Sequence, residues 1–97
     1  MGFKVIFAPQ ALERLEEIVR YIAKDNPTAA EKFGLRLVER AALLADFPAI
    51  GQPYPKRQNV RRLGCKPYWI YYRLQREKRI VEIMDFWHSA RREPYIE

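Results

Sequence analysis

Cysteine and histidine are nearly absent from this sequence of 97 residues, which contains one of each, Cys65 and His88. A single cysteine excludes an internal disulfide framework, and the two residues together leave too few ligands for a tetrahedral zinc site. No apolar run approaches the roughly 18–20 residues that span a bilayer. The first residues also lack the apolar stretch of a secretory signal. We therefore expect a cytoplasmic protein that has no membrane association, no metal and no other cofactor.

The length suits one small domain, residues 1–97, with no room for a second. Hydrophobic residues make up 48% of the chain and aromatic residues 13%, which is enough apolar surface for a packed core.

Charge is distributed unevenly along the chain. In residues 1–50, seven basic and seven acidic side chains cancel, so residues 51–97, with eleven basic and five acidic ones, hold the whole net charge of +6. No carboxylate occurs between Asp46 and Glu77. That window contains Lys56, Arg57, Arg61, Arg62, Lys66, Arg73 and Arg76. Such a block favours a polyanion or an acidic protein as partner, although a solvated basic face is the simpler alternative.

The first half of the chain predicts a strand followed by two helices. Residues 3–7 are rich in β-branched and aromatic side chains, as in a short strand. Apolar residues at helical spacing then predict a helix that begins at Pro9 and ends near residue 25; they are Leu12, Leu15, Ile18, Val19 and Ile22. Asn26 is a plausible N-cap for a second helix, with Pro27 at its first position, that runs to about Asp46. We expect the two helices to form an antiparallel hairpin.

The second half predicts three strands after a proline-rich connector, residues 47–55, that we expect to be irregular. The strands, residues 60–65, 68–74 and 79–88, should pair as an antiparallel meander. In the last strand we expect Val81, Ile83 and Trp87 on one face and Ile80, Met84 and Phe86 on the other. Because a helical hairpin covers one face only, the C-terminal tail or a partner chain should cover part of the other. The predicted fold is α+β, with the order βααβββ and the helices on one face of the sheet.

Several polar residues in this arrangement have the chemistry needed to cleave RNA. If the meander forms, Arg61, Arg73 and His88 can converge on one surface of the sheet, and Arg91 and Tyr95 can reach over it from the tail. Guanidinium groups bind phosphate, histidine can move a proton near neutrality, and a tyrosine can stack on a base. Together they could activate a 2′-hydroxyl and stabilise the charge of the transition state.

Each of these residues also has a structural interpretation. His88 can be a hydrogen-bonded residue at a strand end, and Arg73 can lie over a neighbouring aromatic ring. Aromatic residues 68–72 fit core packing better than base stacking. Cys65 is expected to be an inert buried thiol.

The chain resembles the RelE/ParE superfamily of toxins from bacterial type II toxin–antitoxin modules, which include plasmid stabilisation proteins. The similarity covers essentially the whole chain and lies in five motifs in order. They are Ala8-Pro9-Gln10-Ala11-Leu12-Glu13-Arg14-Leu15, Phe47-Pro48-Ala49-Ile50-Gly51-Gln52-Pro53, Val60-Arg61-Arg62-Leu63, Tyr68-Trp69-Ile70-Tyr71-Tyr72-Arg73 and Phe86-Trp87-His88-Ser89-Ala90-Arg91.

This resemblance implies a growth-inhibiting toxin that a cognate acidic antitoxin neutralises by wrapping it, with operator DNA bound through the antitoxin. ParE-like members bind DNA gyrase, whereas RelE-like members cut mRNA on the ribosome without a metal. The segment after the second helix and the His-Ser-Ala-Arg ending look closer to the ParE-like branch. A degenerate, inactive toxin is a third alternative.

The resemblance also implies roles for the basic residues. In the RelE-like alternative Arg61 and Arg73 would hold the phosphate, while His88 or Tyr95 would transfer the proton. In either branch the expected contact surface for target or antitoxin comprises Arg61, Arg62, Arg73, Arg91 and Arg92.

Overall fold

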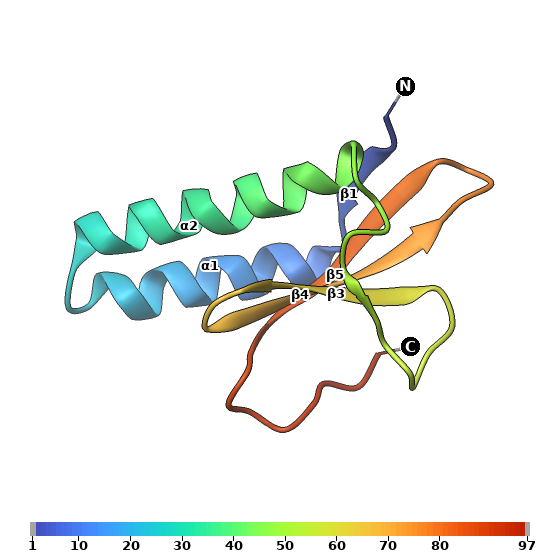
Figure 1. Cartoon of the computed structure of the whole chain (residues 1–97). Helices are drawn as coiled ribbons and strands as arrows, with labels where there is room; N and C mark the ends of the chain where they lie inside the picture. The colour runs from blue at the N-terminus through green and yellow to red at the C-terminus, as the bar shows by residue number, and fades with distance from the viewer. Residues whose placement is uncertain (1, 97) are drawn as a thin grey trace.

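Two antiparallel helices form one layer of the computed structural model, which describes residues 2–96 (Figure 1). Helix α1 spans Pro9–Ala23 and α2 spans Pro27–Ala42, followed by a single 3₁₀ turn, η1, at Leu43–Ala45. Both helices begin with proline, whose missing N–H is not needed in the first turn. The side chain of Asn26 accepts a hydrogen bond from the Ala29 N–H at 3.0 Å. The predicted N-cap is therefore confirmed.

The second layer is a five-stranded sheet with the order β1-β5-β4-β3-β2. Its strands are β1 (Lys4–Phe7), β2 (Gln52–Pro53), β3 (Val60–Cys65), β4 (Tyr68–Gln75) and β5 (Ile80–His88). Strands β3, β4 and β5 form the predicted antiparallel meander, and β1 pairs in parallel with β5. The predicted α+β fold is thus confirmed. The connector is not wholly irregular, however, because β2 pairs with two residues of β3.

The main core lies between the helices and one face of the sheet, which we call the helix face. From the helices it contains Ile18, Leu37, Ala41 and Leu44, and from the sheet Leu63, Ile70, Tyr72, Leu74, Val81, Ile83 and Phe86, among others. A second cluster on the opposite face, the far face, contains Tyr54, Val60, Tyr71 and Ile96. Ile96 belongs to the C-terminal tail, so the tail covers part of the far face, as the sequence predicted.

A β-bulge in β5 overturns the predicted facing of its last residues. Tyr71 of β4 pairs with Asp85 and Tyr72 with Ile83, which leaves Met84 as the extra residue. Beyond this point the alternation shifts by one residue, so Phe86 packs in the main core and Trp87 packs on the far face. The prediction that placed Phe86 with Met84 and Trp87 with Ile83 is therefore wrong.

The buried face of α1 is also rotated relative to the prediction. Ala11 is fully buried, whereas Leu12 is 52% exposed.

Neither helix among residues 2–96 has the length and apolar character that crossing a bilayer demands.

Candidate functional site

Arg61 and Arg73 lie on opposite faces of the sheet. Residues that pair directly across an antiparallel ladder point to the same face. Arg61 pairs with Tyr72, a residue of the main core, so it is on the helix face. Arg73 pairs with Val60, a residue of the far-face cluster. The expected convergence of these two arginines on one surface is therefore wrong, because the ladder alternates them.

Arg61 holds the connector against the sheet. Its Nη1 donates to the carbonyl oxygen of Gly51 at 2.6 Å and to that of Ala49 at 3.2 Å. Beside it, the Tyr72 hydroxyl donates to the Pro48 carbonyl at 2.8 Å and accepts from the Gly51 N–H at 3.0 Å. Burial raises the pKa of Tyr72, which keeps this hydroxyl protonated. Arg61 is thus largely engaged in a structural network.

The far face combines arginine side chains with aromatic rings. Arg62 lies 4.1 Å from the centroid of the Trp69 ring and donates to the Tyr71 hydroxyl at 3.3 Å. Burial raises the pKa of Tyr71, although Arg62 opposes this shift. Arg73 forms an ion pair with Glu82 at 3.6 Å. This face can therefore contact a partner through cationic and aromatic groups at once.

The C-terminal tail crosses the far face and is held by side chains from the connector. Arg57 Nε donates to the Ile96 carbonyl at 2.6 Å, and Lys56 forms an ion pair with Glu93. The hydrogen bond with Lys56 lowers the pKa of Glu93 and raises that of Lys56. Tyr95 is 77% exposed, with the Arg57 guanidinium 5.6 Å from the centroid of its ring.

His88 and Arg91 come together at the other end of the sheet. His88 pairs with Tyr68, and the two rings meet edge to face at 5.1 Å. His88 Nδ1 accepts from the Ala90 N–H at 3.1 Å. Both His88 and Arg91 line a cavity of about 500 Å³ that also includes Arg14 and Tyr21. Tyr95 lines different cavities, so the predicted proton-transfer candidates are separated.

Trp87 connects this cavity to the tail. Arg14 and Arg91 lie 4.9 and 4.3 Å from the centroid of the Trp87 ring. The indole N–H of Trp87 donates to the carbonyl oxygen of Arg92 at 2.7 Å. Arg92 therefore contributes a backbone contact that fixes the start of the tail.

The sequence analysis missed Asp85, whose side chain is 1% exposed. Asp85 accepts hydrogen bonds from Gln10 Nε2 at 2.7 Å, from Arg14 Nε at 3.0 Å and from the Phe86 N–H at 2.9 Å. The hydrogen bond from Arg14 to Asp85 raises the pKa of Arg14. The position of Asp85 among the apolar residues of 80–87 could have indicated its role. A carboxylate in such surroundings is buried only when hydrogen bonds or an opposite charge compensate it.

A helical hairpin on an antiparallel meander, together with a basic second half of the chain, agrees with the fold and charge expected from the resemblance to the RelE/ParE superfamily. Residues 5–93 match the family model that is described as "ParE toxin of type II toxin-antitoxin system". The chain therefore belongs to the ParE toxin family of type II toxin–antitoxin systems.

Individual relatives agree with this assignment. "Putative toxin Y4kP" of Sinorhizobium fredii is 37% identical over 89 residues, which cover 90% of this chain and 88% of the relative. The chromosomal ParDE system from P. aeruginosa has a chain with a TM-score of 0.78 at 19% identity, covering 92% of this chain and 98% of that one. A chain of the RelBE2 complex from Mycobacterium tuberculosis has a TM-score of 0.69 at 22% identity, with coverage of 91% and 99%. At these identities the two structures support the fold.

Proposed function

We propose that this toxin inhibits DNA gyrase by binding it. We also propose that a cognate acidic antitoxin keeps the toxin inactive as long as the two are bound to each other. The match to the ParE family over residues 5–93 supports the toxin's place in the ParE-like branch. The observation that carries the choice of a binding mechanism is the separation of Arg61 from Arg73 on opposite faces. General acid–base cleavage of RNA needs its groups within hydrogen-bond reach of one phosphate. A binding toxin needs only an exposed surface.

The antitoxin part of the proposal is supported by surface chemistry. The net charge of +6 favours an acidic partner. Large apolar side chains are also exposed along the helical hairpin and the connector, including Leu35 at 57%, Phe47 at 58% and Ile50 at 51%. A partner that covers these side chains would remove their apolar surface from water. Relatives with this fold include the toxins of the ParDE and RelBE2 systems, in which toxin and antitoxin are paired.

The RelE-like alternative has one specific observation in its favour. His88 and Arg91 line the same cavity as Arg14, so an imidazole and two guanidinium groups share this cavity. A ribosome-dependent nuclease could use these groups for proton transfer and phosphate binding. In that case translation, and not DNA topology, would be the process that fails first.

Measurements of gyrase activity, DNA damage, mRNA cleavage and growth separate these functions. Purified toxin should inhibit supercoiling by purified gyrase, and induced expression should trigger the DNA-damage response. Primer extension on mRNA from the same cells should show no new cuts within codons. Cuts that disappear in the His88→Gln variant, with gyrase unaffected, would overturn the gyrase proposal in favour of the nuclease. Induced expression that leaves growth untouched would indicate a degenerate toxin.

A further inference from the structure

The outer edge of β3 is only partly covered by another strand. β2 pairs with Arg61 and Arg62, and the Val60 carbonyl oxygen accepts from the Tyr54 N–H at 2.8 Å. Within residues 2–96 the part of β3 without a strand partner on this side is therefore the end that contains Gly64. Arg40 Nε donates to the Gly64 carbonyl oxygen at 2.9 Å, which shows that this carbonyl points to the open edge. In a pleated strand the N–H of the same residue points to that edge as well. An exposed edge of this kind can pair with another chain.

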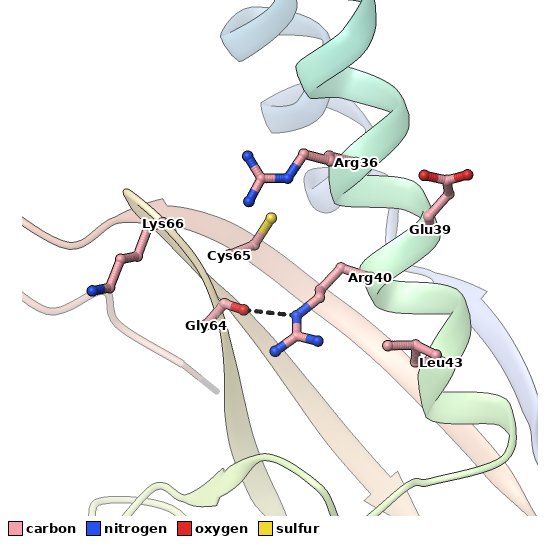
Figure 2. A pocket seen from close by; sticks show the side chains of 7 residues that line it. All are labelled: Arg36, Glu39, Arg40, Leu43, Gly64, Cys65 and Lys66. Carbon is pink, nitrogen blue, oxygen red and sulfur yellow. Dashed lines mark hydrogen bonds between the residues drawn. The ribbon is translucent and has the colours of Figure 1, made fainter.

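A groove of about 720 Å³ runs along this edge, between α2 and the β3–β4 turn (Figure 2). Its lining consists of Arg36, Glu39, Arg40, Leu43, Gly64, Cys65 and Lys66. Figure 2 shows Arg36 and Arg40 reaching from α2 toward β3, while the Glu39 carboxylate points away from the strand. Among the residues that the structure describes, neither Arg36 nor Lys66 forms an ion pair with a carboxylate. With three cationic side chains and one carboxylate among its lining residues, the groove carries a net positive charge.

We propose that an extended segment of the cognate antitoxin binds in this groove as an added β-strand. Its backbone pairs with Gly64 at the edge of β3, and at least one of its carboxylates lies against Arg36 and Lys66. The Gly64 carbonyl oxygen has a second lone pair, so its bond from Arg40 does not prevent this pairing. The inference rests on the proposed function, because it names the place where the antitoxin holds the toxin.

The chemistry of the groove favours an acidic peptide over a nucleic acid. A peptide strand matches the spacing of backbone donors and acceptors along an open edge, which nucleic acid does not. Single-stranded nucleic acid binds where aromatic side chains stack on its bases, and none of the seven lining residues is aromatic. Leu43, which is 39% exposed, instead offers an apolar contact for a peptide side chain.

The first experiment measures the affinity of the full-length toxin for the full-length product of the open reading frame that adjoins its gene. The variant Arg36→Gln with Lys66→Gln removes two exposed charges from the groove. We expect it to weaken binding by about tenfold at low salt, because two interfacial charge pairs are lost. The matched control, Lys4→Gln with Lys24→Gln, removes the same charge from two exposed sites outside the groove and should change affinity by less than about twofold.

The second experiment tests backbone pairing directly. In toxin labelled with ¹⁵N, the amide hydrogen of Gly64 should exchange at least about tenfold more slowly when the antitoxin is bound, because a paired edge amide is protected. Arg36→Gln with Lys66→Gln should retain the thermal unfolding midpoint of the wild type, since both side chains are exposed.

The outcomes distinguish failure of this inference from failure of the proposed function. Tight binding with unchanged exchange at Gly64, or equal weakening by both double variants, would overturn the groove assignment and leave the antitoxin proposal standing. A wild-type toxin that does not bind the adjoining gene product would overturn the proposed partner itself. Binding of a single-stranded oligonucleotide that is lost only in the groove variant would identify a nucleic-acid site, and would also overturn the inference.

Discussion

Asp85 is the charged residue whose removal should destabilise the fold most. Its carboxylate lies at the bulge of β5, is 1% exposed and accepts hydrogen bonds from both Gln10 and Arg14 of α1. It also accepts from the Phe86 N–H, which belongs to the distorted part of the strand. One side chain thus connects α1 to the irregular segment that orients Phe86 and Trp87.

The magnitude follows from what Asp85→Ala leaves behind. Removing one partner of a fully buried ion pair costs about 3–5 kcal/mol, because the other charge stays buried without compensation. The Arg14 side chain is 25% exposed and keeps its contact with Glu17. We therefore expect the lower end, about 3 kcal/mol of unfolding free energy. For a domain of this size that loss lowers the melting temperature by roughly 15 °C.

Urea unfolding followed by circular dichroism measures this loss. The control is Glu17→Gln, which removes the 56% exposed partner of the same arginine and should cost less than about 0.5 kcal/mol. In a double-mutant cycle, adding Arg14→Met to Asp85→Ala should recover at least about 1 kcal/mol relative to the sum of the single changes. A loss below about 1 kcal/mol for Asp85→Ala, or strict additivity in the cycle, would refute the reasoning.

Three further predictions concern the helix cap and the connector. Asn26→Ala should cost about 1 kcal/mol in urea unfolding because the N-cap bond is lost, whereas Asn26→Asp should cost little. Gly51→Ala should cost about 1–3 kcal/mol, because a Cβ atom there would lie 2.7 Å from the Tyr72 hydroxyl oxygen. Gly64→Ala, where the nearest atom is 3.7 Å away, is the control and should be close to neutral. Tyr72→Phe should cost about 1–2 kcal/mol at pH 7. Since burial raises the pKa of Tyr72 in the folded state, the unfolded chain loses this proton first, and the stability falls as pH rises above about 10. Thermal unfolding from pH 8 to 11 should therefore show a smaller alkaline decrease in the Phe variant.

The order of elements could be predicted because local signals mark each boundary. Pro9, Asn26 and Pro27 set the helix starts, and turn residues separate the strands of the meander. These features act within a few residues of the chain, so the sequence contains them directly. Parallel pairing of β1 with β5 depends on contacts between distant segments, and no local pattern indicated it.

The candidate site was harder to predict because it depends on the face that each strand residue occupies. A shift of one residue moves a side chain across the sheet. The pairing of Arg61 with Tyr72 therefore separated it from Arg73, and the bulge at Met84 exchanged the faces of Phe86 and Trp87. The residue that could have indicated the bulge was Asp85. Its burial among apolar residues requires hydrogen-bond partners, and Gln10 and Arg14 reach it only in the folded chain.

The pairing of β1 with β5 has a consequence for synthesis of the toxin on the ribosome. Lys4 is adjacent to Ile80 and Phe7 to Ile83, so the first strand cannot pair with its neighbour until β5 has been synthesised. Until then the hairpin of α1 and α2 has no completed sheet to pack on, and contacts of such long sequence separation form late. A nascent or prematurely terminated polypeptide that ends before β5 therefore lacks the strand with which β1 pairs, and the complete sheet forms only after β5 has been synthesised.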